Sequence, residues 1–485
     1  MKHLLKQLAG ESIIYGISSM LSRFIGIFLV PLYTRLLLPA DYGALSLVNS
    51  TFYFIIVLAV FALDSAAARW YYDTEDINER KKTIASWFWF QLISSLILCS
   101  IIVLCSPLLS TYILKDGSKN ILFIIPALGL LANILPTMVS NWLRFQRKAI
   151  HTVIFTVSTI LINVGLNIFL VLYLKWGVKG ILLSTLISNA IATLYVFTLM
   201  YEWILPTYFS KKILKDMLTY ALPLLPTSLA FWVLNSSSAF VIDYYHTKTD
   251  VGLYQIAAMV ASAVTMIVGA FQMAWGPFAF SIYEKPEAKQ TYSMVLTLYC
   301  ALMCLVALGV AMFAKEGLML LTTKEYYGAY LAAGVLAFNG IIYGMAYIAI
   351  IGCSIHKDNK PLAVSVLFAA GITAILYFLL VPIWGIVGAA LSTALGYLVV
   401  PIYLFYKSQK YWYIPYKFKI AIGIFQFSIF LYALSLSINT SSILINIALK
   451  SLLVCAYLVF LILIFKFQYS DEYQKVKHKL LPSKK

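Results

Sequence analysis

Residues 176–200 read WGVKGILLSTLISNAIATLYVFTLM. Lys179 is the one charged residue in this stretch, and about 20 mostly apolar residues are enough for a helix to cross the hydrocarbon core of a bilayer. Residues 384–406, which read WGIVGAALSTALGYLVVPIYLFY, repeat its pattern. The Trp-Gly-x-x-Gly and Leu-Ser-Thr steps recur at an offset of 208 residues, as do Tyr195 and Phe197. The pair of stretches predicts membrane-spanning helices in a duplicated chain.

A second echo supports the duplication. Asp41-Tyr42-Gly43 recurs as Asp250-Val251-Gly252 at an offset of 209 residues. An even number of spans in each copy inserts both copies in the same orientation, with an axis along the membrane normal. We therefore predict an all-α integral membrane protein with two six-helix lobes related by a pseudo-two-fold axis along the normal, plus two extra C-terminal helices. The predicted units are residues 1–205, 206–410 and 411–485.

About fourteen apolar runs fill the chain from Ser12 to Phe467 and are long enough to span a bilayer. The predicted spans are 12–37, 42–68, 83–107, 120–142, 150–174, 178–203, 217–243, 251–278, 289–314, 327–352, 361–381, 385–406, 417–438 and 442–466. An even count places both termini on one side, and the basic tail after Phe467 predicts that this side is cytoplasmic.

The composition also places the chain in a membrane. Apolar residues make up 62% of it, charged residues 11%, and the mean hydropathy is +0.88, values far from those of soluble domains. With a cytoplasmic N-terminus, about 26 of the 36 Lys and Arg fall on the inside, in segments such as Arg80-Lys81-Lys82 and Lys211-Lys212, against about eight on the outside. The net charge of +17 is therefore explained by the positive-inside rule, and no nucleic-acid partner is expected.

Motifs of soluble enzymes are absent from the sequence. The six cysteines lie in or beside apolar runs and form no C-x-x-C pair, so neither a disulfide framework nor a zinc site is indicated. The five histidines are scattered, and there is no P-loop, nucleophile elbow or dinucleotide turn. We expect no cofactor, no metal and no catalytic residues.

The first span carries a charged residue on a face of small residues. Ser12, Gly16, Ser19, Arg23 and Gly26 follow at alternating steps of three and four, which places them on one side of a helix. An arginine near mid-span costs about 2.5–3.5 kcal/mol on insertion scales. Either Arg23 pairs with an acid or carbonyl of a neighbouring helix, or it binds an anionic substrate in a wet cavity.

Amide and hydroxyl stripes recur on later spans. Asn163 and Asn167 lie on the fifth span, Asn235 on the seventh and Gln272 on the eighth. Each stripe alone is typical of helix–helix contacts, because small and hydroxyl residues favour close packing in membranes. Stripes at corresponding places in both halves favour a cavity between two lobes.

Three further charges fall within or at the ends of predicted spans. Asp64 and Asp243 are candidate sites for a coupling ion, although each could equally pair with a nearby basic group. Lys450 lies about eight residues into the last span, where it either extends its ammonium toward the interface or meets a substrate headgroup.

The N-terminal motifs resemble those of a known family. They are Gly16 to Arg23, Pro31-Leu32-Tyr33-Thr34-Arg35-Leu36-Leu37, Asp41-Tyr42-Gly43, and Leu63-Asp64-Ser65-Ala66 with Arg69-Trp70-Tyr71-Tyr72. This pattern is similar to that of bacterial polysaccharide flippases, the O-antigen and exopolysaccharide transporters of the multidrug/oligosaccharidyl-lipid/polysaccharide (MOP) superfamily. In the related lipid II flippase a Ser-Arg step of the first helix supplies a cavity arginine, and Ser22-Arg23 matches it.

The resemblance implies a multi-pass protein of the bacterial cytoplasmic membrane that moves undecaprenyl-diphosphate-linked oligosaccharides from the inner to the outer leaflet. Its partners would be the lipid-linked glycan, membrane lipids, and a polysaccharide polymerase with glycosyltransferases. The substrate-binding candidates are Ser19, Arg23, Arg35, Arg69, Asn163, Asn167, Asn235, Gln272 and Lys450.

Two other functions stay open at this stage. A cation-coupled multidrug antiporter of the same superfamily is expected to have twelve spans and carboxylates deep in its N-terminal lobe. A non-transporting scaffold for glycosyltransferases needs no buried arginine on a small-residue face.

Overall fold

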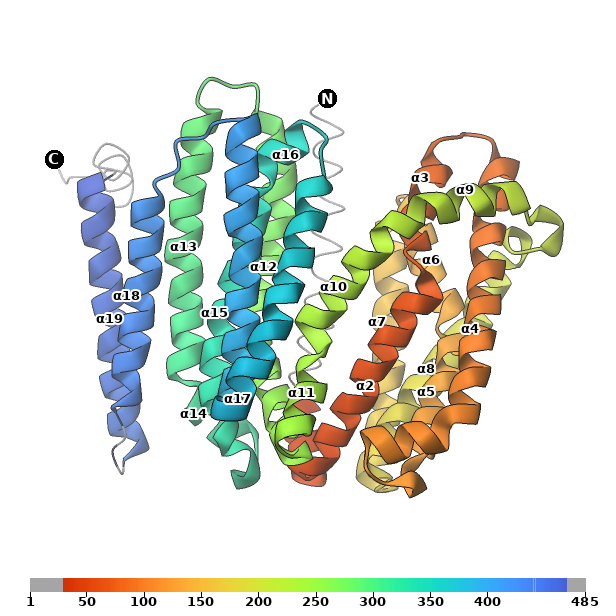
Figure 1. The fold of residues 1–485 in the computed structure, drawn as a ribbon, viewed down its shortest axis with the longest axis horizontal. Coiled ribbons are helices and arrows are strands. Elements are labelled where there is room, and N and C mark those ends of the chain that lie inside the picture. Colours follow the sequence, from red (N-terminus) through yellow and green to blue (C-terminus); the bar gives the residue numbers. More distant parts are fainter. Residues whose placement is uncertain (1–28, 439, 441, 469–485) are drawn as a thin grey trace.

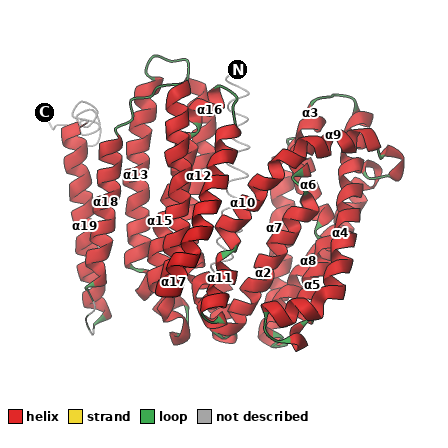
Figure 2. Cartoon of the chain, viewed as in Figure 1, coloured by secondary structure: helices red, strands yellow, loops and turns green. Residues whose placement is uncertain are grey.

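The computed structural model describes residues 29–438, 440 and 442–468, and within them all regular structure is helical (Figure 1, Figure 2). The first bundle and its trailing helix comprise α2 (Pro39–Val60), α3 (Leu63–Tyr72), α4 (Ile77–Ile113), α5 (Ile121–Ala132), α6 (Ile134–Phe145), α7 (Ala149–Asn167), α8 (Gly177–Met200) and α9 (Lys211–Ala221). The second bundle comprises α10 (Leu225–Ser236), α11 (Ser238–Tyr245), α12 (Lys248–Ile282), α13 (Ala288–Met312), α14 (Ala314–Leu321), α15 (Tyr330–Ala349), α16 (Ile351–Ile355) and α17 (Lys360–Tyr411). Two last helices, α18 (Phe418–Leu436) and α19 (Ile443–Gln468), pack on α13 and on each other.

Twelve helices of the described chain are long and apolar enough to cross a membrane, and the predicted all-α membrane fold is confirmed. The count differs from fourteen for two reasons. Most of the predicted span 12–37 lies outside the described residues. Helix α17 covers both 361–381 and 385–406, with a break inside it at Gly385. The boundaries predicted at residues 205 and 410 stay predictions.

The two Trp-Gly steps of the repeat both hold the glycine at a positive φ. Gly177 follows Trp176 with φ of 55°, and Gly385 follows Trp384 with φ of 53°. Glycine adopts this left-handed region at little cost because it has no Cβ. Each step therefore turns the chain between two successive spans at the same place in the repeat.

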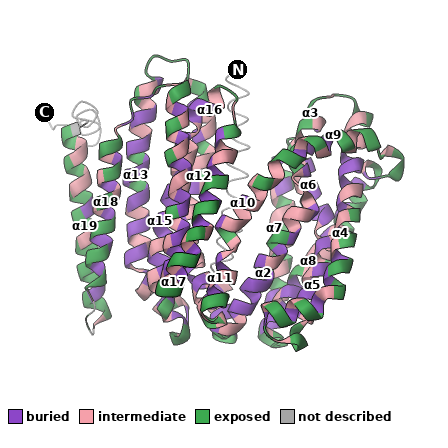
Figure 3. Cartoon of the chain, viewed as in Figure 1, coloured by how far each residue is buried: buried purple, intermediate pink, exposed green. Residues whose placement is uncertain are grey.

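Most large apolar side chains at the outer surface have no protein neighbour to cover them. Figure 3 shows exposed positions along α4 and α19, among them Leu104 at 80% and Leu444 at 78% exposure. Helical backbone and apolar side chains together are what a lipid-facing surface requires, because lipid offers no hydrogen bonds.

The bundle ends differ in charge. The first turns of α4 and of α9, at the top of Figure 1, carry Arg80-Lys81-Lys82 and Lys211-Lys212, and we call this the basic end. The α4–η1 connection (η1, Gly117–Lys119) and the α11–α12 turn lie at the bottom, which we call the far end. Helix α12 begins there with a capping box, in which Thr247 and Asp250 each bond the backbone N–H of the other.

Candidate functional site

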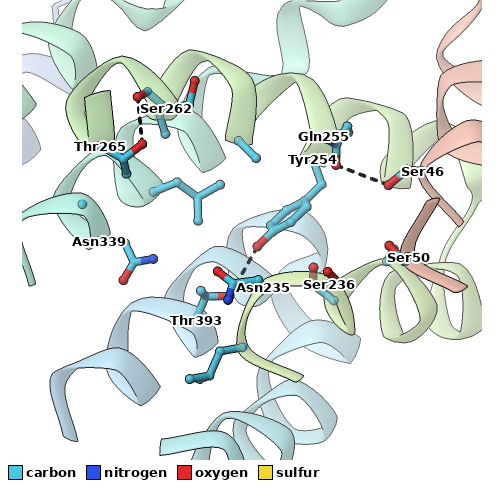
Figure 4. A pocket seen from close by; sticks show the side chains of 17 residues that line it. Ser46, Ser50, Asn235, Ser236, Tyr254, Gln255, Ser262, Thr265, Asn339 and Thr393 are labelled. Carbon is cyan, nitrogen blue, oxygen red and sulfur yellow. Dashed lines mark hydrogen bonds between the residues drawn. The ribbon is translucent and has the colours of Figure 1, made fainter. Parts of the chain in front are cut away.

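A polar cavity of about 230 Å³ lies where the first bundle meets the second (Figure 4). Its walls come from α2, α10, α11, α12, α15 and α17. Eleven of its lining residues carry hydroxyl or amide groups: Ser238 and the ten that the figure labels, Ser46, Ser50, Asn235, Ser236, Tyr254, Gln255, Ser262, Thr265, Asn339 and Thr393. On α12, Gln255, Ser262 and Thr265 follow at steps of seven and three residues, which places them on one helical face.

Hydrogen bonds hold this wall in place. The Ser46 hydroxyl of α2 donates to Gln255 Oε1 of α12 at 3.3 Å, so the bond joins the two bundles. Tyr254 and Thr393 share a hydrogen bond of 3.3 Å between α12 and α17. The Oδ1 atom of Asn339 is buried and has no hydrogen-bond partner in the described chain. An unmet buried acceptor of this kind is costly unless a ligand or water supplies a donor.

A second space of about 270 Å³ continues the first toward Gln272. The two share Asn235, Thr265, Asn339 and Gly340 in their linings, so we treat them as one central cavity. Two predicted site residues, Asn235 and Gln272, both line it. The Asn235 amide is held by two bonds, since its Nδ2 donates to Phe231 O at 2.7 Å and its Oδ1 accepts from the Tyr397 hydroxyl at 2.9 Å.

The far end of the cavity is closed by a contact to which the two repeats contribute equivalent residues. A Cβ atom on Gly43 would overlap the carbonyl of Lys248, and a Cβ on Gly252 would overlap the carbonyl of Pro39. The echo Asp41-Tyr42-Gly43 therefore packs directly against its own repeat. Ser46 and Gln255, bonded one turn away, are also separated by 209 residues. Contacts in which equivalent residues exchange roles are the signature of a two-fold axis, which here passes between α2 and α12.

Charged groups reinforce the closure at the far end. Lys115 Nζ lies 3.2 Å from Asp243 Oδ2 and donates to the Asp243 carbonyl at 3.1 Å. Lys248 Nζ donates to the carbonyl of Leu114. Both lysines thus join the α4–η1 connection of the first bundle to the second bundle.

A family model described as polysaccharide biosynthesis protein matches residues 32–331. The chain belongs to this family. Among solved structures it is similar to the lipid II flippase MurJ in an inward closed conformation, with a TM-score of 0.69 and 16% identity over 94% of this chain and 99% of that one. An outward-facing multidrug resistance MATE family transporter of the MOP superfamily gives a TM-score of 0.58 and 18% identity over 84% and 97%. A MOP superfamily transporter from Pyrococcus furiosus gives 0.56 and 17% over 84% and 97%. No curated protein sequence matches the chain. These likenesses establish a MOP-type fold for this polysaccharide biosynthesis protein.

The other charged candidates lie outside the described lining of the central cavity. Arg35, Asp64 and Arg69 have exposed side chains. The guanidinium of Arg69 lies 5.0 Å from the ring centre of Tyr220, a cation–π contact. Asp243 is paired with Lys115, as described above. The roles predicted for these residues stay predictions.

Two predicted residues, Ser19 and Arg23, lie outside the described residues. Their proposed place on a cavity-facing helix stays a prediction from sequence.

Asn163 and Asn167 bond to helices within the first bundle. The Tyr33 hydroxyl donates to Asn167 Oδ1 at 3.0 Å, and Asn167 Nδ2 donates to Asn163 Oδ1 at 2.9 Å. Asn163 Nδ2 then donates to the Ser188 hydroxyl at 3.2 Å. The chain of bonds connects three helices, so these amides take part in helix–helix contacts, one of the alternatives for the polar stripes. Substrate binding by Asn163 and Asn167 stays a prediction.

Lys450 forms an ion pair inside the protein. Its Nζ lies 2.6 and 2.9 Å from the two carboxylate oxygens of Glu316, and the side chains are 7% and 12% exposed. The pair joins α19 to α14. The pair therefore fixes the last helix to the second bundle. From the sequence, the two alternatives for Lys450 were contact with the membrane interface and binding of a substrate headgroup.

Removal of one partner of this pair should destabilise the protein strongly. Lys450→Ala leaves a buried carboxylate alone, a change that costs about 3–5 kcal/mol. Thermal unfolding in lipid nanodiscs should show a clear fall in Tm for Lys450→Ala and little change for Lys450→Leu combined with Glu316→Leu, since an apolar pair needs no partner charge. Lys466→Ala, at an exposed position of the same helix, is the control. A Tm for Lys450→Ala equal to that of the control would show that the pair contributes nothing.

The sequence prediction missed Asn339 and the Tyr254–Thr393 contact. Asn339 is the single amide of the predicted span 327–352, which has no charged residue, and an isolated amide among apolar residues was a usable signal. Thr393 stands in the repeated Leu-Ser-Thr step, but its partner Tyr254 is 139 residues away and no local pattern connects them.

Proposed function

We propose that this chain moves undecaprenyl-diphosphate-linked oligosaccharides from the inner to the outer leaflet of the bacterial cytoplasmic membrane by alternating access. The basic end would face the cytoplasm, with both termini on that side. The observation that carries the proposal is the central cavity, which is shared by two repeated bundles and lined by neutral hydrogen-bonding groups.

The chemistry of the lining supports a sugar ligand over an organic cation. Among the described residues around the central cavity there is no Asp, Glu, Lys or Arg. Amides and hydroxyls both donate and accept hydrogen bonds, which matches the hydroxyl groups of a glycan. A multidrug antiporter is expected to carry carboxylates deep in its N-terminal lobe, and a scaffold would need no such cavity.

The arrangement of the bundles supports alternating access. The small-residue contact of Gly43 with Gly252 closes the far end, and a rocking movement of one bundle against the other would open it. Parallel repeats that move against each other around a fixed midplane site are a known design of secondary transporters.

The charged and lipid parts of the substrate need separate places. We propose that Arg23 holds the diphosphate, because a guanidinium binds such groups through two parallel hydrogen bonds. The polyprenyl tail would remain in lipid beside α18 and α19, which pack at the edge of the second bundle on α13. Coupling of transport to an ion at Asp64 or Asp243, and association with a polymerase and glycosyltransferases, stay predictions.

The central cavity can be tested by removing its amides. Asn235→Leu and Gln272→Leu should each slow translocation of a fluorescent undecaprenyl-diphosphate oligosaccharide about tenfold, because each removes hydrogen bonds worth about 1 kcal/mol apiece. The assay uses proteoliposomes and a leaflet-specific quencher.

Asn359→Leu serves as the matched control, because Asn359 is exposed at the start of α17 and its side chain caps nothing. Unchanged rates in both cavity variants would remove the central cavity from the pathway. Efflux of a lipophilic cation by wild-type protein that translocates no glycolipid would favour the antiporter.

A further inference from the structure

The first bundle holds a second space, with several amides in a mostly apolar lining, that is separate from the central cavity. One part, of about 270 Å³, reaches Asn49 and Gln91, and another, of about 340 Å³, reaches Arg144. The two parts share Asn133 and Asn189 in their linings, so we treat them as one space and call it the first-bundle cavity. Its described lining has no residue in common with that of the central cavity.

Helix α2 lines both cavities. Ser46 and Ser50 line the central cavity, whereas Asn49 and Tyr53 line the first-bundle cavity. The four positions follow at steps of three, one and three, so their side chains project from neighbouring parts of one side of the helix. The two cavities therefore lie beside each other along α2.

Three amide residues of the first-bundle cavity have side-chain groups that are not satisfied by the described part of the protein. Gln91 is 5% exposed, and its Oε1 has no hydrogen-bond partner in the described chain. Within the same part of the chain, no side-chain hydrogen bond is formed by Asn133 or Asn189. Buried polar atoms nearly always have partners, so a built pocket with unmet amides indicates a ligand that both donates and accepts hydrogen bonds.

The lining excludes some ligand classes. Among its described residues there is no Asp or Glu, so the site offers no counter-charge for a cation. The amides are accompanied by the aromatic rings of Phe52, Tyr53 and Phe155, against which apolar faces of a ligand can pack. Amides beside aromatic rings in a concave site suit a ligand with polar edges and apolar faces, and a neutral sugar ring has both.

We propose that the first-bundle cavity binds an uncharged sugar unit of the transported glycan. The inference rests on the proposed function and extends it, because it gives the substrate two sugar sites, both lined by α2. A glycan long enough to reach both sites gains the second contact as an intramolecular event, which raises affinity without any change at the first site. The transporter thereby selects completed oligosaccharides over the bare lipid carrier.

The test measures binding to purified full-length protein in nanodiscs. The probes are a polyprenyl diphosphate bearing a neutral four-sugar glycan and the same polyprenyl diphosphate without sugar. Gln91→Leu and Asn189→Leu should each weaken binding of the glycolipid about tenfold and leave binding of the bare lipid unchanged, because hydrogen bonds to sugar are lost and the diphosphate site is intact. Asn359→Leu should change neither affinity. Asn189→Ala replaces Asn189→Leu if the larger side chain lowers the Tm.

The outcomes separate this inference from the proposed function. Glycolipid binding that is unchanged in both cavity variants would overturn the sugar site and leave the proposed function standing. Folded wild-type protein that binds neither lipid would overturn the proposed function itself. Binding of tetraphenylphosphonium that is lost in Asn189→Leu would assign the cavity to cationic ligands and overturn the sugar site.

Discussion

Valine in place of Gly43 should slow translocation about tenfold or more, because it hinders closure of the far end. The Cβ of any side chain at this position overlaps the backbone carbonyl of Lys248, and a backbone atom cannot move aside without separating α2 from α12. Forced overpacking costs about 1–3 kcal/mol. Since the cost falls on the closed state alone, we expect a shift of about tenfold or more toward the open state and a similar fall in the rate.

The two-fold axis makes the experiment symmetric. Gly252→Val should have the same effect as Gly43→Val, because its Cβ meets the carbonyl of Pro39 in the same way. Gly309→Val is the matched control, since nothing lies within 4 Å of a Cβ there. Opening at the far end is measured by labelling a Ser46→Cys variant with a membrane-impermeant maleimide from that side, against protein without this cysteine. Wild-type transport by both glycine variants would show that this contact is not the closure.

Alanine in place of Arg23 should abolish glycan export while the protein level stays near normal. Two charge-assisted hydrogen bonds to the diphosphate, each worth about 1.5–3 kcal/mol, would be lost, which corresponds to about a hundredfold or greater fall in affinity. Arg23→Lys should restore part of the activity, because lysine keeps the charge but not the planar fork.

The readouts are surface glycan and membrane-inserted protein in the same cells. Normal export by Arg23→Ala would refute the diphosphate role. Loss of the protein itself, in both Arg23→Ala and Arg23→Lys, would instead assign Arg23 to a structural ion pair.

The repeat was the most informative part of the sequence, because short residue motifs recur in it at a nearly constant offset of 208 or 209 residues. The Trp-Gly steps at 176 and 384 predicted where spans begin, and the left-handed glycines at both explain why. The echo at Gly43 and Gly252 predicted equivalent positions in two halves. That these positions touch could not be predicted, because it depends on how the bundles dock.

The polar stripes were harder to interpret. Asn163 and Asn235 both look like amides on an otherwise apolar helix, yet Asn163 bonds across to Ser188 whereas Asn235 lines the central cavity. The difference is made by the neighbouring helix, which single-helix periodicity does not report. In the same way, nothing near Lys450 indicates Glu316, which is 134 residues earlier.

The self-facing contact of Gly43 with Gly252 also bears on ancestry. If the two halves descend from one shorter gene, its product would have paired with an identical copy, and each glycine would have faced its own duplicate. A single mutation there would have created two steric collisions at once, so selection against it would have been doubled. Fusion into one polypeptide removed that coupling between positions. Each half then became free to diverge, and α2 now lines the first-bundle cavity, to which α12 contributes no described residue.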